Sequence, residues 1–319
     1  MMDYEKLKKI KKDLTIEIES MHKALLATFP VATYLQKTTL IPKIGSYKPK
    51  GLEVNAYSQS ILDAYDQNAL ESYHKLVLVN LILRAEDRLK QKKMPEDIIR
   101  LFIKNFNSII KRIESKYARQ GFYLFSNNKF CNDFAVCRLS MIPAGQQKIH
   151  LDGIARRFLF KNGVKQFLKF SAFIFFELGG FKPLYQMHTD SFDRDLLAEF
   201  NFEGTKGFYL RVAELLKLNP GVKGVFGIGW TNDPQLASIS PKLWQGVGYL
   251  VDNGAKLFNL GSSKSAISGA TYVSLKRKQL YEEGKYMPTN YLLVWSRKKL
   301  LAWADRLLGQ HCEIKATVL

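Results

Sequence analysis

Residues 222–230 read VKGVFGIGW and predict a buried β-strand that carries glycine at three positions. Glycine in an apolar strand marks a bulge or a backbone that another group approaches closely. For Gly224, Gly227 and Gly229 two interpretations remain open: a ligand lies against the strand, or a helix packs tightly onto the sheet. Both place this strand inside a sheet, and the polar loop TNDP at 231–234 ends it.

Strands and helices alternate on both sides of this stretch. PLYQMHTD at 183–190 predicts a strand, and the residues from Thr205 to Leu218 predict an amphipathic helix. A loop-rich stretch is expected up to residue 253. After it we expect strands at 255–260 and 289–295 and helices at 274–283 and 300–308. This alternation predicts an α/β or α+β domain, in which helices flank a mixed sheet.

The first part of the chain has a different pattern, typical of helices. Helices are expected over residues 4–26 and 69–92, and a further one opens at Met94-Pro95-Glu96-Asp97. Pro and Gly in 40–57 indicate an irregular connection. The stretches 121–128 and 134–145 read as two short strands. We therefore predict a mostly helical N-terminal region, residues 1–120, followed by a sheet domain, residues 121–319.

The segment 154–178 combines five basic residues with seven phenylalanines and ends at Gly179-Gly180, as a helix C-terminus would. Three interpretations are open for it. Basic and apolar faces are typical of a membrane-surface helix, but also of a buried helix under a basic rim. The apolar side chains are also suited to line a tunnel for an acyl chain. We favour packing in the core.

The composition bounds the class of protein. The chain has 319 residues, 46% of them hydrophobic, and a formal net charge of +19 that is spread over its length. It is therefore a folded, strongly basic protein, with a surface suited to nucleic acid, an anionic membrane, an acidic carrier protein or a phosphorylated cofactor. The charged N-terminus is not a secretory signal, and no apolar run has the ~20 residues of a membrane span. We expect a cytoplasmic location.

Candidate chemical groups gather after the strand at 183–190. His188 stands two residues before Asp190, a spacing that suits a general base held by a carboxylate, or a solvated strand end. His150 and Asp152 repeat the pattern more weakly. The cysteines Cys131, Cys137 and Cys312 have neither zinc nor disulfide spacing and are expected to be reduced thiols. No metal motif, Walker motif or dinucleotide fingerprint occurs, and no metal is expected.

A resemblance to a known family lies near the C-terminus. RKQLYEEGKYMP at 277–288, followed by TNYLLVW, resembles the terminal helix and strand of GNAT-type N-acyltransferases, which carry a pattern near A-x-x-LYE-x-x-GF-x-P. Leu280, Tyr281, Glu282 and Pro288 match that pattern. The resemblance extends over about residues 120–300. It is closer to divergent acyltransferases, such as N-acyl amino acid or autoinducer synthases, than to ordinary acetyltransferases.

The resemblance implies a GNAT-like fold with the site between two splayed parallel strands. The pantetheine of an acyl-CoA or acyl-carrier-protein thioester would lie between the strands that end at Asp190 and Trp230, with its pyrophosphate at the helix that starts near Gly204. The implied base is His188 or Glu199, and the implied acid is Tyr281. The implied cofactor-binding residues are Gly204, Thr205, Lys206, Arg211, Gly227, Gly229 and Trp230.

Two functions of different classes follow from the sequence. The first is an acyltransferase that moves an acyl group from an acyl-CoA or acyl-carrier-protein thioester to a small-molecule amine. The alternative is a non-catalytic basic protein that binds nucleic acid or an anionic membrane surface. Acyl transfer to an aminoacyl-tRNA-derived amine would combine both features.

Overall fold

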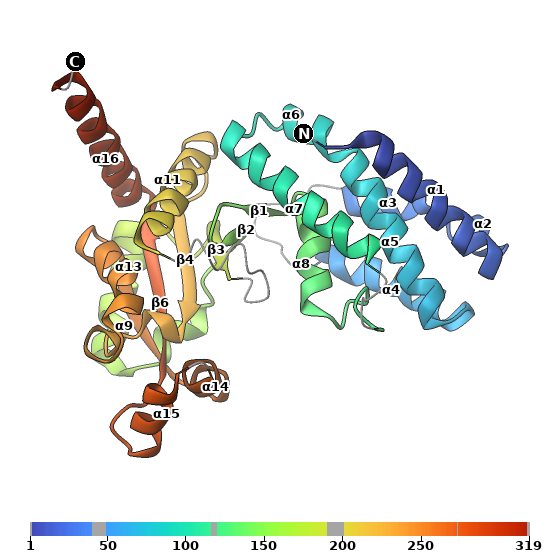
Figure 1. Cartoon of the computed structure of the whole chain (residues 1–319). Helices are drawn as coiled ribbons and strands as arrows, with labels where there is room; N and C mark the ends of the chain where they lie inside the picture. The colour runs from blue at the N-terminus through green and yellow to red at the C-terminus, as the bar shows by residue number, and fades with distance from the viewer. Residues whose placement is uncertain (1, 40–48, 116–119, 190–200, 273, 318–319) are drawn as a thin grey trace. The chain divides into compact units, whose positions relative to one another are not determined.

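The computed structural model describes residues 2–39, 49–115, 120–189, 201–272 and 274–317, and side chains except those of 37–39, 49–55 and 310–317. The chain divides into two compact units, Met1–Ala144 and Gly145–Leu319, which Figure 1 shows with their helices and strands labelled. The mixed α/β class, with a mostly helical N-terminal part, agrees with the prediction from the sequence.

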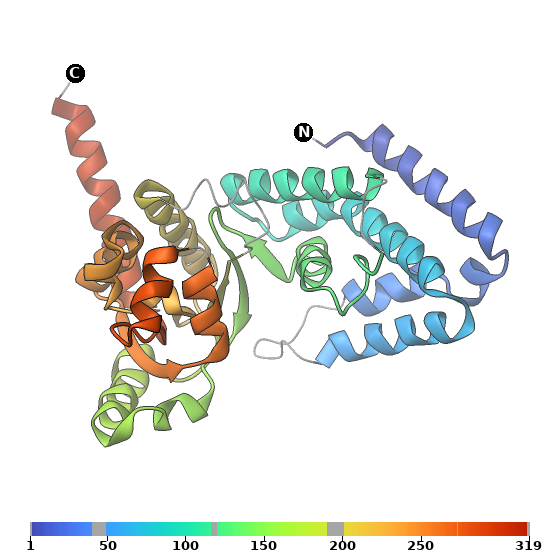
Figure 2. The ribbon, with the colours of Figure 1, turned by 60° about the horizontal axis from the view of Figure 1, so that its bottom comes forward.

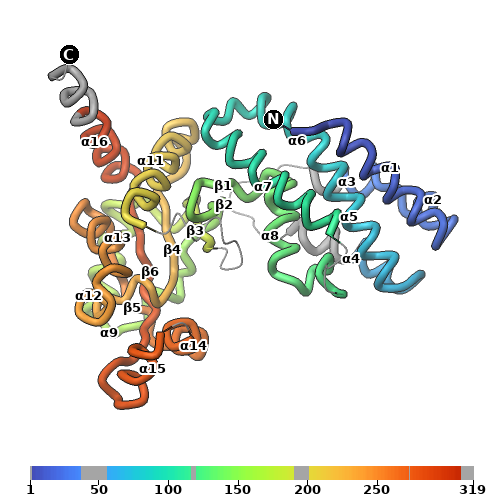
Figure 3. Tube along the Cα trace, in the orientation of Figure 1, coloured from blue at the N-terminus to red at the C-terminus, as the bar shows by residue number. Residues whose placement is uncertain are grey.

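The first unit is built from helices around a central buried one. Helix α5 has buried residues on every side, as a helix enclosed by others must. Helix α7 begins where predicted, with Pro95 at its N-cap and Glu96 and Asp97 in its first turn. Figure 3 traces these helices, which are α1 (Tyr4–Met21), α2 (Leu25–Thr28), α3 (Val31–Thr39), α4 (Pro49–Ala64), α5 (Gln67–Leu83), α6 (Ala85–Gln91), α7 (Glu96–Glu114) and α8 (Asn128–Cys137).

Four predictions for this unit were wrong. The helix expected over 4–26 is two helices, α1 and α2, separated at residues 22–24. The helix expected over 69–92 is two helices, α5 and α6, separated at Arg84. The connection expected over 40–57 already contains the start of α4 at Pro49. The strands expected at 121–128 and 134–145 are a turn and helix α8, and only β1 (Met141–Pro143) is a strand. The Asn127 side chain accepts hydrogen bonds from Lys129 N and Phe130 N, and this cap starts α8 despite its aromatic residues.

A buried histidine makes the first unit sensitive to acid. His74 is 1% exposed, its Nδ1–H donates to the Tyr123 carbonyl, and its Nε2 accepts from the Ser58 hydroxyl at 2.8 Å. Burial lowers the pKa of His74 to about 4, against the weaker opposing effects of the Tyr123 hydrogen bond and the Glu71 charge. The ring is therefore neutral in the folded chain at pH 5, where it is protonated in the unfolded chain.

We expect the first unit to lose stability on acidification. Between pH 6.5 and about 4 only the unfolded chain binds the His74 proton, so the free energy of unfolding falls by about 1.4 kcal/mol per pH unit, about 3 kcal/mol in all. Urea unfolding followed by circular dichroism measures this slope. His74→Phe should flatten it and His22→Ala, a change at a partly exposed histidine, should not. An unchanged slope in His74→Phe would contradict the assignment.

The second unit is organised around a mixed sheet. Its strands lie in the order β2 (Lys148–Asp152), β3 (Leu184–His188), β4 (Gly224–Gly229), β6 (Thr289–Ser296), β5 (Lys256–Ser262). Strands β3 and β4 are parallel, and the β2–β3, β4–β6 and β6–β5 pairs are antiparallel. The strands predicted at 183–190, 222–230, 255–260 and 289–295 are confirmed.

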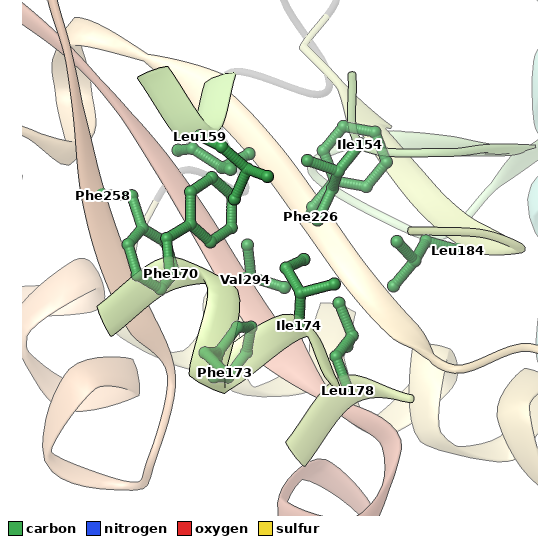
Figure 4. Packing of buried hydrophobic residues seen from close by; sticks show 11 residues of the cluster. Ile154, Leu159, Phe170, Phe173, Ile174, Leu178, Leu184, Phe226, Phe258 and Val294 are labelled. Atoms are coloured by element: carbon green, nitrogen blue, oxygen red, sulfur yellow. The ribbon is translucent and has the colours of Figure 1, made fainter. Parts of the chain in front are cut away.

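Helices cover both faces of this sheet. Neighbouring residues on β6 point to opposite faces, so this strand contributes side chains to the packing on each side. Val294 points into a core with Phe170, Phe173 and Ile174, which Figure 4 shows from close by. Trp295 points to the other face, where its ring contacts Tyr209 of α11 (Phe202–Leu218) at 5.3 Å and Trp303 of α16 (Arg297–Thr317) at 5.1 Å between centroids.

Two predictions about the helices of this unit were wrong in detail. The stretch up to residue 253 is helical in part, with η3 (Trp230–Asn232), α12 (Leu236–Ile239) and α13 (Pro241–Asp252). The segment 154–178 is three pieces, η1 (Arg156–Phe160), α9 (Gly163–Ala172) and the π-helical η2 (Phe173–Leu178). Gly163, with φ +71°, separates the first two, and Gly179, with φ +77°, ends the third as expected.

A further pair of helices lies between strands β5 and β6 in the chain. The helices α14 (Lys264–Tyr272) and α15 (Leu275–Glu282) lie side by side, as Figure 2 shows. Helix α15 was expected from the sequence, and α14 was not. The predicted terminal helix at 300–308 belongs to the longer α16.

Candidate functional site

The parallel strands β3 and β4 separate after two paired residues. Tyr185 pairs with Val225 and Gln186 with Phe226, and the pairing ends there. Both strands nevertheless continue, because β3 pairs with β2 as far as His188 and β4 pairs with β6 as far as Gly229. The strands therefore form a fork, defined here as Met187 and His188 on one side and Gly227, Ile228 and Gly229 on the other. Main-chain groups on its inner edges have no partner in the neighbouring strand.

Glycine at 227 gives room to a methionine at this fork. A Cβ on Gly227 would lie 2.5 Å from Cε of Met187, so no larger residue fits with Met187 in its present place. The Tyr209 hydroxyl of α11 donates to the Met187 sulfur at 3.2 Å and holds that side chain. A thioether side chain is flexible and can move aside. The group that lies close to Gly227 is thus Met187 of the neighbouring strand β3, which is neither the ligand nor the packed helix of the two interpretations.

Two histidines stack at the end of β3. The rings of His150 on β2 and His188 on β3 lie 4.5 Å apart between centroids at 26°. Burial lowers the pKa of His188, with Lys148 acting in the same direction and Asp152 against it. The pKa of His150 falls to about 3, mainly through burial and then through His188. Within the described part of the chain, Nε2 of His188 is buried without a hydrogen-bond partner. A neutral imidazole with a free nitrogen is a competent proton acceptor.

The start of α11 is held by hydrogen bonds of its own. The Asn201 side chain accepts from Gly204 N at 2.8 Å. The Thr205 hydroxyl lies against Asn201 O and the Gln146 side chain and is 9% exposed. Lys206 pairs with Glu203 at 2.9 Å and lies over the Phe202 ring. Of the two cationic residues predicted to bind the donor, Lys206 and Arg211, only Lys206 is in the first turns of α11.

Arg211 lies two turns further along α11. Its guanidinium is 3.6 Å from the position that a Cβ on Gly207 would take. Gly229 ends β4 in extended backbone, and Trp230 follows it in η3. The Arg277 guanidinium stacks over the Trp230 ring at 5.0 Å. Trp230 is thereby part of a packed cluster under α14 and α15, together with Leu236, Ala270, Tyr286 and Leu280.

Sequence reasoning missed the residue that organises this cluster. Asp233 is fully buried; its Oδ1 accepts from Gln235 N at 3.0 Å and its Oδ2 from Thr289 N at 3.2 Å. Burial raises the pKa of Asp233, and the hydrogen bonds from Gln235 and Thr289 act against it. Asp233 thus ties the end of β4 to the start of β6. The polar loop TNDP directly after an apolar strand was the signal that pointed to it.

The remaining predicted site residues are placed as follows. Tyr281 is half-buried on α15, and no hydrogen bond joins it to His188 in the part of the chain that the structure describes. Glu199 and Asp190 lie outside the described residues. Among the described residues, neither Cys131 nor Cys137 forms a disulfide bond, and the side chain of Cys312 lies outside the described ones. Among the residues described, no cluster of His, Cys, Asp or Glu could hold a metal ion. No described helix has the length and apolar character that spanning a membrane requires.

Solved structures similar to this chain are acyltransferases. One, an acyltransferase in complex with decanoyl-CoA and teicoplanin, matches 75% of this chain and 68% of its own with a TM-score of 0.44 and 12% identity. Another, in complex with CoA and 10C-teicoplanin, matches 88% and 77% with a TM-score of 0.43 and 12% identity. No family model and no curated protein matches the chain. At these values the likenesses do not assign it to a family.

Proposed function

We propose that the second unit is an acyltransferase that moves an acyl group from a CoA or acyl-carrier-protein thioester to an amine. The observation that carries the proposal is the fork between β3 and β4, where two parallel strands part while each stays paired on its outer side. An extended pantetheine arm carries amide groups along its length. The unpaired main-chain groups of the fork are suited to bind such an arm as a further strand would.

The groups around the fork suit the chemistry of amide formation. His188 is neutral and its Nε2 atom is free. It takes a proton from the acceptor amine as the amine nitrogen attacks the thioester carbonyl carbon. Main-chain N–H groups near Gly227 and Gly229 stabilise the oxyanion that forms. The C–S bond then breaks, and the leaving thiolate takes a proton from Tyr281. Glu199 is the second proposed base.

The charged groups of α11 fit the phosphates of the donor less well than the fork fits its pantetheine arm. In this proposal Gly204, Thr205 and Lys206 lie nearest the pyrophosphate, at a helix start that favours anions. Lys206 is 2.9 Å from Glu203, so binding a phosphate requires that this surface ion pair open, which costs about 1 kcal/mol or less. Arg211 would contact a more distant part of the donor. The net charge of +19 attracts both CoA and an acidic carrier protein.

Thermal unfolding with acyl-CoA thioesters of several chain lengths tests the proposal. We expect one of them to stabilise the protein, by about 2.7 kcal/mol at a hundredfold excess over its Kd. Gly227→Val should abolish the effect, because the new side chain and Met187 fill the fork. The matched control is Gly221→Val, at an exposed position where a Cβ meets nothing. Holo acyl-carrier protein, assayed in parallel, distinguishes the donor.

The proposal fails if no thioester of either kind changes the melting temperature of the wild-type protein. It also fails if Gly227→Val remains folded and is stabilised as strongly as Gly221→Val, because the donor would then lie elsewhere.

A further inference from the structure

The segment from Phe160 to Phe176 exposes apolar side chains in a helical stripe. Phe160, Val164 and Leu168 follow one another at intervals of four residues, and they are 73%, 75% and 61% exposed. Val164 and Leu168, four residues apart, lie on one side of α9, and Phe160 ends η1, the piece that precedes it. Phe175 and Phe176 continue the stripe on η2 at 62% and 91% exposure. Large apolar side chains that gather in this way on a surface mark a binding site.

A basic stripe runs beside the apolar one. Lys165 and Lys169 each follow a member of the apolar stripe by one residue and so occupy the adjacent side of α9, while Lys161 follows Phe160 at the end of η1; all three are exposed. Arg156 and Arg157 precede them. No Asp or Glu occurs between Asp152 and Glu177, and Glu177 is paired with Lys299 at 2.9 Å. The face is therefore positively charged along its whole length.

The opposite side of α9 and η2 is fixed in the core. Phe170, Phe173 and Ile174 are buried against the sheet, with Phe170 stacked on Phe258 of β5 at 4.0 Å between ring centroids. Figure 4 shows this inner side. The helix is thus apolar on its buried side and on its exposed one. Packing against the sheet explains why the buried side is apolar. It does not explain why the exposed side is apolar, because those side chains have no function in the fold.

Two consecutive phenylalanines, Phe175 and Phe176, lie on the outer side of the π-helical turn η2. In η2 the Gly179 N–H bonds to the Ile174 carbonyl five residues back, a wider turn than that of an α-helix. Ile174 and Leu178 stay in the core, while Phe175 and Phe176 point away from it. A buried core needs only the first pair. The second pair extends the apolar stripe by another turn.

A hollow beside the lysines completes the surface. It has a volume of about 310 Å³ and is lined by Asn162, Lys165, Gln166, Lys169, Leu257 and Phe258. The ammonium groups of Lys165 and Lys169 suit a phosphate, and the apolar side chains of Leu257 and Phe258 suit the first carbons of a chain attached to it.

From these observations we infer that the face formed by Phe160, Val164, Leu168, Phe175 and Phe176 with Lys161, Lys165 and Lys169 docks on an anionic phospholipid membrane. The apolar stripe enters the boundary between headgroups and acyl chains, and the lysines contact lipid phosphates, as in helices that lie in the membrane interface. A nucleic acid would use the lysines and stack on the phenylalanines, but Val164 and Leu168 offer it neither charge nor an aromatic ring. The inference is independent of the proposed acyl transfer.

Co-sedimentation with lipid vesicles tests the inference. The full chain should bind vesicles that contain phosphatidylglycerol, and bind pure phosphatidylcholine vesicles at least tenfold more weakly. Lys161→Gln/Lys165→Gln/Lys169→Gln should weaken binding to the anionic vesicles by about a hundredfold. The charge-matched control is Lys9→Gln/Lys12→Gln/Lys242→Gln, at exposed positions on α1 and α13, and it should bind nearly as the wild type does.

A second pair of variants tests the apolar stripe. Leu168→Ser/Phe176→Ser should reduce binding at least tenfold with an unchanged melting temperature. The control Tyr272→Ser/Leu275→Ser changes residues that are 88% and 85% exposed on α14 and α15, and it should bind normally.

Four results would overturn the inference. The first is equal binding to neutral and anionic vesicles, and the second is an equal loss of binding in the control variants. The third is tight binding to RNA that Leu168→Ser/Phe176→Ser leaves intact, with no vesicle binding. The fourth is self-association, seen by sedimentation and abolished by the same double change, again with no vesicle binding. The face would then contact a second copy of the chain.

Discussion

His188→Ala is expected to lower kcat/KM for acyl transfer by about a hundred- to a thousandfold while the melting temperature stays within a few degrees. Removal of a general base has effects of this size. The Nε2 atom of His188 makes no hydrogen bond in the described part of the chain, so removing the ring costs the fold its stacking on His150 but no hydrogen bond of that atom. A residue whose function is structural would show the opposite, a stability change with the rate preserved.

The pH dependence of the same reaction gives an independent readout. Burial lowers the pKa of His188 in the folded chain, so the imidazole stays neutral below pH 6.5. The acid limb of kcat/KM should therefore fall with an apparent pKa below 6.5, and it should disappear from the residual activity of His188→Ala. His22→Ala, a histidine change in the first unit, should leave both rate and pH profile as in the wild type. Unchanged kcat/KM in His188→Ala would exclude this residue as the base.

Gly224→Ala is expected to lower the free energy of unfolding of the second unit by about 3 kcal/mol. Gly224 has φ +154°, a region that L-residues rarely adopt. A Cβ there would lie 2.3 Å from the Trp295 carbonyl oxygen and 3.1 Å from Arg297 N. The first atom belongs to β6, the antiparallel partner strand, and the second to the first residue of α16, so relief requires that β4 move away from the end of β6 and the start of α16. Backbone strain and lost strand pairing together have costs of this size.

Urea unfolding followed by tryptophan fluorescence measures this effect in the right unit, because all four tryptophans lie in residues 230–303. Gly221→Ala, in the exposed loop before β4, is the control and should change stability by less than about 1 kcal/mol. A Gly224→Ala protein as stable as this control would mean that the backbone at 224 is not held as the structure has it.

The parts of the fold that the sequence predicted are those in which local pattern and burial agree. The alternation in 183–190 and the apolar runs in 222–230 and 289–295 each produced a strand, since a strand at the centre of a sheet is apolar on both faces. Helix α8 was missed because Phe130 and Phe134 favour strands locally, whereas tertiary packing of their rings decides the helix. Helices α12, α13 and α14 were missed because glycine and serine obscure their period.

The candidate site was predictable in place but not in detail. The family resemblance implied that two parallel strands part, and the register of β3 and β4 shows two paired residues before they do. Which side chains occupy it depends on contacts between residues far apart in the chain. Met187 and Tyr209 meet across 22 positions, and His150 and His188 across 38, and no local spacing encodes either pair.

The Gln166 side chain has a consequence for the solubility of this sheet. Its amide donates to Asn259 O at 2.8 Å and accepts from Asn259 N at 2.9 Å, which satisfies main-chain groups on β5, the last strand of the order. An uncovered border strand is a template for edge-to-edge aggregation. The Gln166 side chain makes at Asn259 the pair of hydrogen bonds that the backbone of another chain would make, so this part of the edge is already paired within the molecule.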